Sequence, residues 1–255
     1  MNTHTSKPDC IACTEAKQFV EPYGQVNHEK TTKPGDLTHI DVWGKYDTVS
    51  IHCNQYFLLM VDDASQYVTT EFLKEKKEDA TKVKKYLAKL ISHNKKPKAI
   101  HIVWGKEFLN VMTWCQENGI DIQKTAPYLS SKNDIAKRMN HTLVEITHAM
   151  LRGSPEFLWE YTISHALYIC NRASTKALKN ITPYEKWFQK KPYVSHLREF
   201  GSLVWVLLQG DKNSRKMETK SQRQIFVGFD DGAKSIKNYN AENTESTYLK
   251  KYSLS

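Results

Sequence analysis

A lysine-rich stretch is the part of this sequence whose residue types most clearly suggest a binding chemistry. Residues 74–98 contain ten lysines against three acidic side chains, a net charge of +7 in a chain whose total is +9. Clustered ammonium groups bind the phosphate backbone of nucleic acids without reading the base sequence, and salt weakens that binding. The solvated face of an ordinary lysine-rich helix has the same composition. Composition alone leaves both interpretations open.

The side chains that would contact phosphate fall into two patches. The first patch follows an expected helix and the segment after it, and comprises Lys82, Lys84, Lys85, Lys89, Lys95 and Lys96. The second patch lies in a linker between two expected strands, and comprises Lys212, Arg215, Lys216 and Lys220. No motif for reading base edges accompanies either patch, so we expect DNA binding of low sequence specificity.

Composition excludes several classes of protein. The chain has 255 residues, of which 40% are hydrophobic and 11% aromatic, enough to build a core, so it is not wholly disordered. No apolar run approaches the ~20 residues that span a bilayer, and residues 1–17 lack the apolar segment of a signal peptide, so we expect no membrane partner. The five cysteines are odd in number and scattered, which suits a reducing compartment, nuclear or cytoplasmic.

Apolar periodicity predicts the elements that would position these side chains. Residues 37–43 alternate apolar and polar side chains, which predicts a strand with a polar face carrying His39 and Asp41. Further strands are predicted at 55–62, 66–73, 99–103 and 120–123, and helices at 79–93, 107–116 and 133–151. A next helix would have Ser154 as its N-cap and Pro155 at its first position. This order indicates an RNase H-like α/β domain.

Short β segments follow Pro183, at residues 203–208, 224–229 and 247–252. They predict a small β module after the α/β domain.

Short motifs along the chain resemble the integrase region of copia-type LTR retrotransposons. No single motif is decisive, but their shared order and spacing cover most of the chain. The motifs are Cys10-x-x-Cys13, residues 35–44 (GDLTHIDVWG), 56–67 (YFLLMVDDASQY), 105–108 (GKEF), 126–128 (APY), 136–143 (AKRMNHTL), 182–187 (TPYEKW), 191–192 (KP), 195–201 (SHLREFG), 220–221 (KS) and 225–229 (IFVGF).

The resemblance implies an α/β fold with an RNase H-like integrase core, built on a mixed five-stranded sheet with flanking helices, followed by a small β-barrel module. We expect residues 1–34 to be a remnant of a zinc-binding module with a linker, 35–180 the core, and 181–255 a helical connector with the barrel-like module. Integrases of this family act as oligomers and reach chromatin through other proteins. A homo-oligomer and a chromatin-associated protein partner are therefore expected.

Family integrases hold two Mg²⁺ or Mn²⁺ ions with three carboxylates. The resemblance places the first carboxylate at Asp41, which is retained, and the other two at Val103 and Lys137. Valine offers no oxygen to a hard cation, and lysine adds a positive charge where the metal ions would lie. Asp62 and Asp63 are nearby acids for which we expect a structural role. The resemblance therefore predicts a chain without a bound metal and without strand-transfer activity.

The family's amino-terminal module binds Zn²⁺ through two histidines and a Cys-x-x-Cys pair. Tetrahedral zinc needs four ligands, and Cys10 and Cys13 supply two of them. His4 lies too close to this pair to reproduce the spaced histidines. We therefore expect half a zinc site, without bound zinc, in a chain truncated inside this module.

Three functions remain open at this point. The first is a degenerate or domesticated integrase that keeps nucleic-acid binding, the second an active integrase with a non-standard metal site, and the third a domesticated protein-interaction scaffold. Loss of two of three carboxylates in a chain whose core pattern is intact favours the first.

Overall fold

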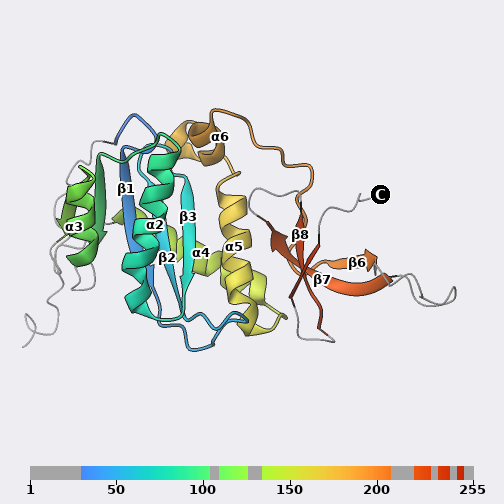
Figure 1. The fold of residues 1–255 in the computed structure, drawn as a ribbon. Coiled ribbons are helices and arrows are strands. Elements are labelled where there is room, and N and C mark those ends of the chain that lie inside the picture. The colour runs from blue at the N-terminus through green and yellow to red at the C-terminus, as the bar shows by residue number, and fades with distance from the viewer. Residues whose placement is uncertain are drawn as a thin grey trace, which may run out of the picture.

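The computed structural model describes residues 30–103, 109–125, 134–207, 221–230, 235–241 and 246–249. Its larger sheet has five strands in the order β3-β2-β1-β4-β5 (Figure 1). In chain order they are β1 (Leu37–Trp43), β2 (Tyr56–Asp62), β3 (Val68–Leu73), β4 (Ala99–Val103) and β5 (Asp121–Thr125). Strands β1, β2 and β3 pair antiparallel, whereas β4 and β5 run parallel to β1, so the sheet is mixed as predicted.

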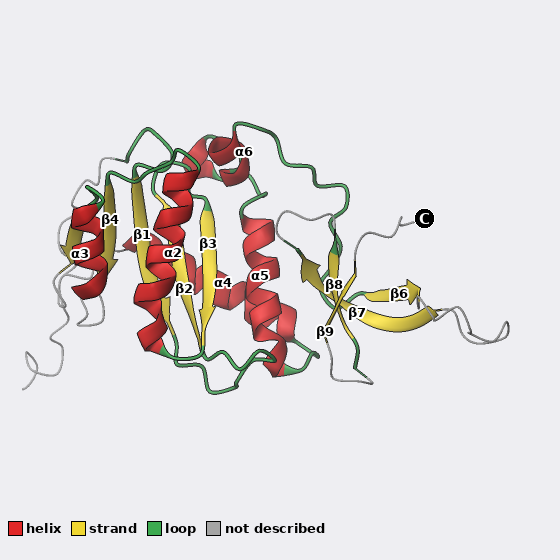
Figure 2. Cartoon of the chain, viewed as in Figure 1, coloured by secondary structure: helices red, strands yellow, loops and turns green. Residues whose placement is uncertain are grey.

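Helices cover both faces of this sheet (Figure 2). The front face in that view carries α2 (Asp79–Ser92) and α3 (Leu109–Glu117), and the back face carries α4 (Asp134–Leu151) and α5 (Trp159–Cys170). Short 3-10 turns at Lys76–Glu78, Glu156–Leu158 and Lys176–Leu178 complete the connections. None of the helices in the described ranges is both long and apolar enough to cross a bilayer.

Two apolar cores, one on each face, follow from the alternation of side chains along the strands. Ile40 of β1 packs toward α2 with Val83, in the core on the front face. Trp43 of β1 packs with Phe57 against α4 and α5, on the back face. Asp41 is two residues from Trp43 and therefore points to the same back face, toward α4.

A second sheet follows the helical connector α6 (Pro183–Phe188). Its antiparallel strands are β6 (Leu203–Leu207), β7 (Ser221–Phe229), β8 (Ile236–Tyr239) and β9 (Ser246–Leu249), in that spatial order. The predicted β module is thus present, and β8 is a strand that the sequence pattern did not predict. Within the described residues the module is a row of four strands, and its closure into a barrel stays a prediction, as do the three domain boundaries.

The start of α5 differs from the prediction. Ser154 was expected to cap the helix, but its backbone N–H donates to the Leu151 carbonyl at 2.8 Å and so closes the preceding helix. Pro155 has an extended backbone, with ψ 132°, and is itself the cap of the 3-10 turn. The cap of the 3-10 turn is therefore one residue later than predicted, and α5 itself begins at Trp159 with Leu158 as its N-cap.

Candidate functional site

Asp41 lies near the carboxyl end of β1, half-buried against α4. Asn140 of α4 donates a hydrogen bond from Nδ2 to Asp41 Oδ2 at 2.7 Å. Burial raises the pKa of Asp41 above its ordinary value, because a low-dielectric surrounding disfavours the charged form. The Asn140 hydrogen bond and the positive charge of Lys137 oppose that rise in the pKa. The carboxylate thus has two stabilising partners on one helix.

The other two positions singled out in the sequence converge on Asp41. Strands β1 and β4 run parallel with Ile40 beside Ile102, so Asp41 and Val103 follow as neighbours at the carboxyl ends of these strands. Lys137 lies on α4 one turn before Asn140, and its charge acts on the carboxylate of Asp41. Positions 41, 103 and 137 therefore lie at the same end of the sheet.

The residue types at these positions do not fit a pair of divalent cations. Asp41 offers carboxylate oxygens, valine at position 103 offers none, and Lys137 carries a charge that repels a metal ion. Across the described ranges, no three or more His, Cys, Asp or Glu side chains are grouped so that they could hold a metal.

A buried histidine network occupies the same face of the sheet as Asp41. His39, two residues before Asp41, is 1% exposed. Its Nε2 lies 3.3 Å from Asp63 Oδ1, and its Nδ1 lies 3.2 Å from His101 Nδ1. Thr31 donates to the other carboxylate oxygen of Asp63 from its backbone nitrogen and its hydroxyl, at 2.6 and 2.9 Å. The sequence interpretation missed this network, although the shared polar face of His39 and Asp41 was a usable signal.

Asp62 and Asp63 have the structural role expected of them. Asp62 accepts hydrogen bonds from the backbone nitrogens of Gly35 at 2.6 Å and Ser65 at 2.7 Å. Both aspartates are buried, and together they fix the start of β1 and the turn after β2. These two carboxylates are therefore engaged with the protein backbone and side chains.

Curated proteins similar to this chain include transposon polyproteins. No protein-family model matches it. The retrovirus-related Pol polyprotein from transposon TNT 1-94 of Nicotiana tabacum is 30% identical over 232 residues, covering 89% of this chain and 17% of that protein. The chain is a homologue of copia-type retrotransposon Pol polyproteins. The Pol polyprotein from transposon RE2 of Arabidopsis thaliana is 26% identical over 225 residues, covering 86% of this chain and 15% of that protein. The chain thus spans about a sixth of the length of these curated relatives.

This Pol homologue has the fold of an integrase. A chain of the simian T-cell lymphotropic virus intasome, solved in complex with the PP2A regulatory subunit B56 gamma, superposes with a TM-score of 0.55 at 16% identity. The match covers 94% of this chain and 84% of that chain. The mixed five-stranded sheet with helices on both faces is the RNase H-like core of that fold, so the predicted fold of the core is confirmed, and the barrel stays a prediction.

The α2 lysines of this Pol homologue lie on the front face of the sheet, opposite Asp41. Lys85 and Lys89 are exposed. Lys82 forms an ion pair with Glu71 of β3 at 3.1 Å, and Lys84 is half-buried near α3. The lysines of the first patch therefore diverge around the helix, and two of them extend freely toward solvent along α2.

Lys95 connects the segment after α2 to α6. Its Nζ donates to the Trp187 carbonyl at 2.6 Å and lies 3.8 Å from the centroid of the Trp187 ring. Burial lowers the pKa of Lys95, and Tyr67 stacks on Trp187 at 5.4 Å. Lys95 thus has a partner within the chain, whereas Lys96 is exposed.

Several predicted site residues lie outside the described residues. They are the second basic patch, Lys212, Arg215, Lys216 and Lys220, and the half zinc site, Cys10 and Cys13. Their roles stay predictions.

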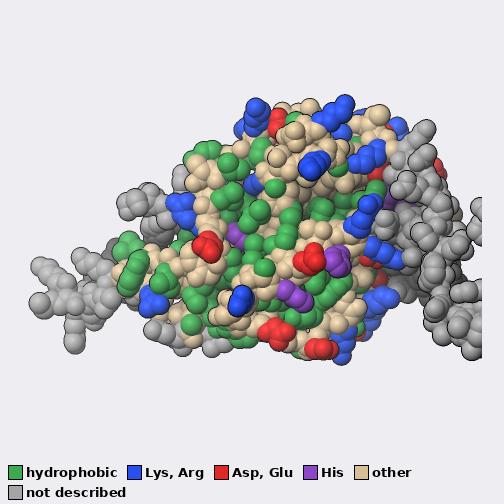
Figure 3. Space-filling view, turned by 180° about the vertical axis from the view of Figure 1, so that it is seen from behind, with side chains coloured by type: hydrophobic (Ala, Val, Ile, Leu, Met, Phe, Trp, Pro, Cys, Tyr) green, Lys and Arg blue, Asp and Glu red, His purple; other side chains and the backbone are tan. Residues whose placement is uncertain are grey.

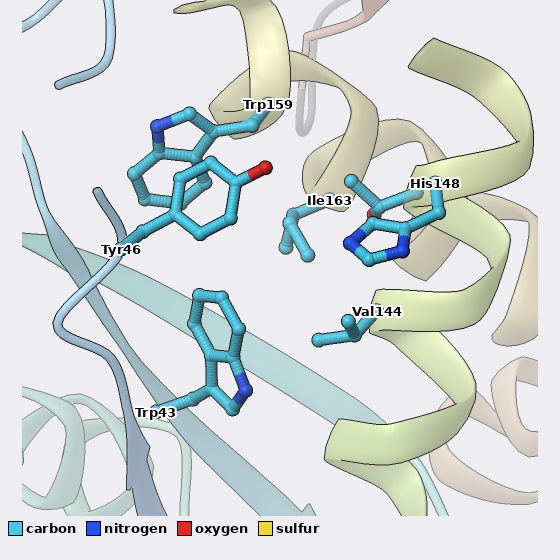
Figure 4. A pocket seen from close by; sticks show the side chains of 7 residues that line it. Trp43, Tyr46, Val144, His148, Trp159 and Ile163 are labelled. Atoms are coloured by element: carbon cyan, nitrogen blue, oxygen red, sulfur yellow. The ribbon is translucent and has the colours of Figure 1, made fainter. Parts of the chain in front are cut away.

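Aromatic rings close the space between the end of β1, α4 and α5 (Figure 4). The ring centroids of Trp43 and Tyr46 are 5.5 Å apart, and those of Tyr46 and Trp159 are 5.6 Å apart. The cavity left between these rings, Val144 and Ile163 has a volume of about 10 Å³. Because such a space holds one water molecule at most, we interpret this cluster as core packing.

Proposed function

We propose that this chain is a retrotransposon integrase-derived protein that lacks strand-transfer activity and keeps an affinity for nucleic acid. The observation that carries the proposal is the convergence of Val103 and Lys137 on Asp41. Strand transfer in this class needs carboxylates that hold two cations, which clamp the attacking and leaving oxygens of the phosphodiester. The sequence has valine and lysine at two of the three positions that the family resemblance assigns to these carboxylates.

Lys137 supplies part of what a metal ion would supply to Asp41. A half-buried carboxylate is costly without a counter-charge or hydrogen-bond donors. The ammonium group of Lys137 and the amide of Asn140 provide both, from one face of α4. These two groups offset part of the cost of burying Asp41 without a metal ion, which favours an inactive enzyme over one with a non-standard metal site.

The wild-type chain should have no strand-transfer activity above background, and replacing Asp41 should leave that background unchanged. We expect the full chain to give no joined product from a labelled duplex in Mg²⁺ or Mn²⁺, because the cation clamp is lacking. Asp41→Asn should leave that background unchanged on a sequencing gel, with a retroviral integrase on its own DNA end as the positive control. A product that disappears in Asp41→Asn would overturn the proposal in favour of an active integrase.

Duplex binding should depend on the exposed α2 lysines. Each phosphate contact contributes about 0.9 to the slope of log affinity against log salt, so Lys85→Ala with Lys89→Ala should lower that slope by about two and the affinity by up to about sixtyfold at 0.1 M salt. Fluorescence anisotropy of a labelled 20-base-pair duplex measures both. The matched control is Lys33→Ala with Lys45→Ala, which removes the same charge from exposed sites elsewhere. Equal losses in the two double variants would show that net charge, rather than the α2 surface, drives binding.

We also propose that the chain self-associates and works in the nucleus or the cytoplasm, as its family resemblance implies. Light scattering on the purified chain tests the first part, because a monomer at micromolar concentration would contradict it.

A further inference from the structure

A row of rings and one guanidinium group connects α5 with the segment that leads to β6. Tyr193 stacks on His196, with ring centroids 5.4 Å apart and ring planes 13° apart. His196 Nε2 lies 2.7 Å from the hydroxyl of Tyr168 on α5. The guanidinium of Arg172 lies 3.3 Å from the centroid of the Tyr168 ring. The ring of Tyr193 is therefore held in place through His196 and Tyr168 of α5, although Tyr193 itself is in an irregular segment.

The row continues onto α6. Arg172 lies 4.8 Å from the ring centroid of Tyr184, and Tyr184 lies 4.6 Å from that of Phe188. Both ends of the row are open to solvent, since Tyr193 is 72% exposed and Phe188 is 48% exposed. Exposed ring faces of this kind are the platforms on which unpaired nucleobases stack.

Positive charge surrounds this row. Residues 172–198 contain seven Lys and Arg side chains against one acidic side chain, Glu185, a net charge of +6. Lys190 and Lys191 are exposed and within three residues of Tyr193. Figure 3 shows Lys and Arg side chains gathered along the upper edge of the molecule, where α6 lies. Such a surface attracts a phosphate backbone.

This surface is separate from the candidate site. Lys95, just before β4, contacts Trp187, so α6 lies at the amino ends of β1 and β4. Asp41 is at the other end of β1. The row of rings therefore does not form part of the site at Asp41.

We propose that the surface formed by Phe188, Lys190, Lys191 and Tyr193 binds a single-stranded segment of nucleic acid. The lysines contact its phosphates, and the bases stack on the exposed rings. A duplex hides the faces of its bases, so the rings contribute to single-strand binding while the lysines contribute to both. An acidic peptide would use the cations alone, which leaves the two exposed rings without a function. The inference adds a second surface to the nucleic-acid binding of the proposed function.

Anisotropy of the full chain with a fluorescein-labelled 12-nucleotide oligothymidylate and with a 12-base-pair duplex tests this assignment. Tyr193→Ala should lower affinity for the single strand by about five- to a hundredfold and leave duplex affinity within about twofold, because base stacking is lost. Tyr193→Phe keeps the ring and should bind like the wild type. Trp205→Ala is the matched control, because Trp205 on β6 is also 72% exposed and should change neither affinity.

Each other outcome is informative. Three results would overturn the single-strand assignment. The first is an equal loss of single-strand affinity in Tyr193→Ala and Trp205→Ala, and the second is an equal loss of single-strand and duplex affinity in Tyr193→Ala. The third is displacement of the oligonucleotide by poly-glutamate at equal concentration. Single-strand binding that ignores Tyr193, together with duplex binding that needs Lys85 and Lys89, would overturn this inference and leave the proposed function intact. An unchanged thermal midpoint in Tyr193→Ala excludes unfolding as the cause of any loss.

Discussion

Replacing Val103 by aspartate and Lys137 by glutamate should allow the chain to bind Mn²⁺ at Asp41. The two substitutions put carboxylates at positions that adjoin Asp41 from β4 and α4, and carboxylate oxygens are the ligands that hard divalent cations prefer. A ligand that binds only the folded state at about a hundredfold over its dissociation constant raises the free energy of unfolding by about 2.7 kcal/mol. We expect a gain of that order for the double variant in Mn²⁺, and none for the wild type.

Urea unfolding with and without Mn²⁺ measures this gain, and three variants act as controls. Lys137→Glu alone removes a cation that lowers the pKa of Asp41, so that pKa should rise further and the metal-free protein should be less stable. Val103→Asp alone should respond weakly to Mn²⁺, because Lys137 still repels the ion. Adding Asp41→Asn to the double variant should abolish the response. A double variant that ignores Mn²⁺ would show that these positions no longer have a metal-binding geometry.

The core sheet was predictable because each strand carries its own signal. β2 is a continuous apolar run buried on both faces, and β1 alternates apolar and polar side chains. β8 carries no such signal, since Ile236–Tyr239 includes a lysine and an asparagine. Asn238 is nevertheless fully buried, because its neighbours β7 and β9 place it there. Tertiary pairing, rather than the preference of the segment itself, makes β8 a strand.

Motif order alone was enough to predict which positions lie together, whereas the roles of these residues stay predictions. Asp41, Val103 and Lys137 are fixed by their places in successive motifs, and the structure brings these positions together. The contact of His39 with His101 depends on parallel pairing across 62 residues, which no local pattern reveals. Lys95 was grouped with its neighbouring lysines, whereas its partner Trp187 is 92 residues away.

His165 of α5 should make the protein less stable in mild acid. It is 1% exposed, and neither of its ring nitrogens has a hydrogen-bond partner among the described residues. The rings of Phe200, Phe226 and Phe229 surround it at centroid distances of 5.8, 5.5 and 5.7 Å. Burial lowers the pKa of His165 from 6.5 to about 4. The folded protein therefore excludes a proton that the unfolded chain accepts.

The sign of the effect follows from this difference in proton binding. Well above pH 6.5 the imidazole is neutral in both states and adds no pH-dependent cost. As the pH falls from about 6.5 toward about 4, only the unfolded chain gains a proton. At about 1.4 kcal/mol per pH unit, roughly 2 kcal/mol should be lost between pH 7 and 5, and roughly 3 kcal/mol by pH 4.

Urea unfolding of His165→Leu against the wild type at pH 7 and pH 5 isolates this loss, since leucine cannot titrate. His141→Leu is the control for replacing a helix histidine by leucine at an exposed site, because His141 on α4 is 75% exposed. Parallel pH profiles for the wild type and His165→Leu would mean that the imidazole reaches water in solution.

Because His165 packs α5 against Phe226 and Phe229 of β7, acid should first weaken the contact between the core and the second sheet. Near-ultraviolet circular dichroism of these aromatic residues should therefore change before the far-ultraviolet signal of the core.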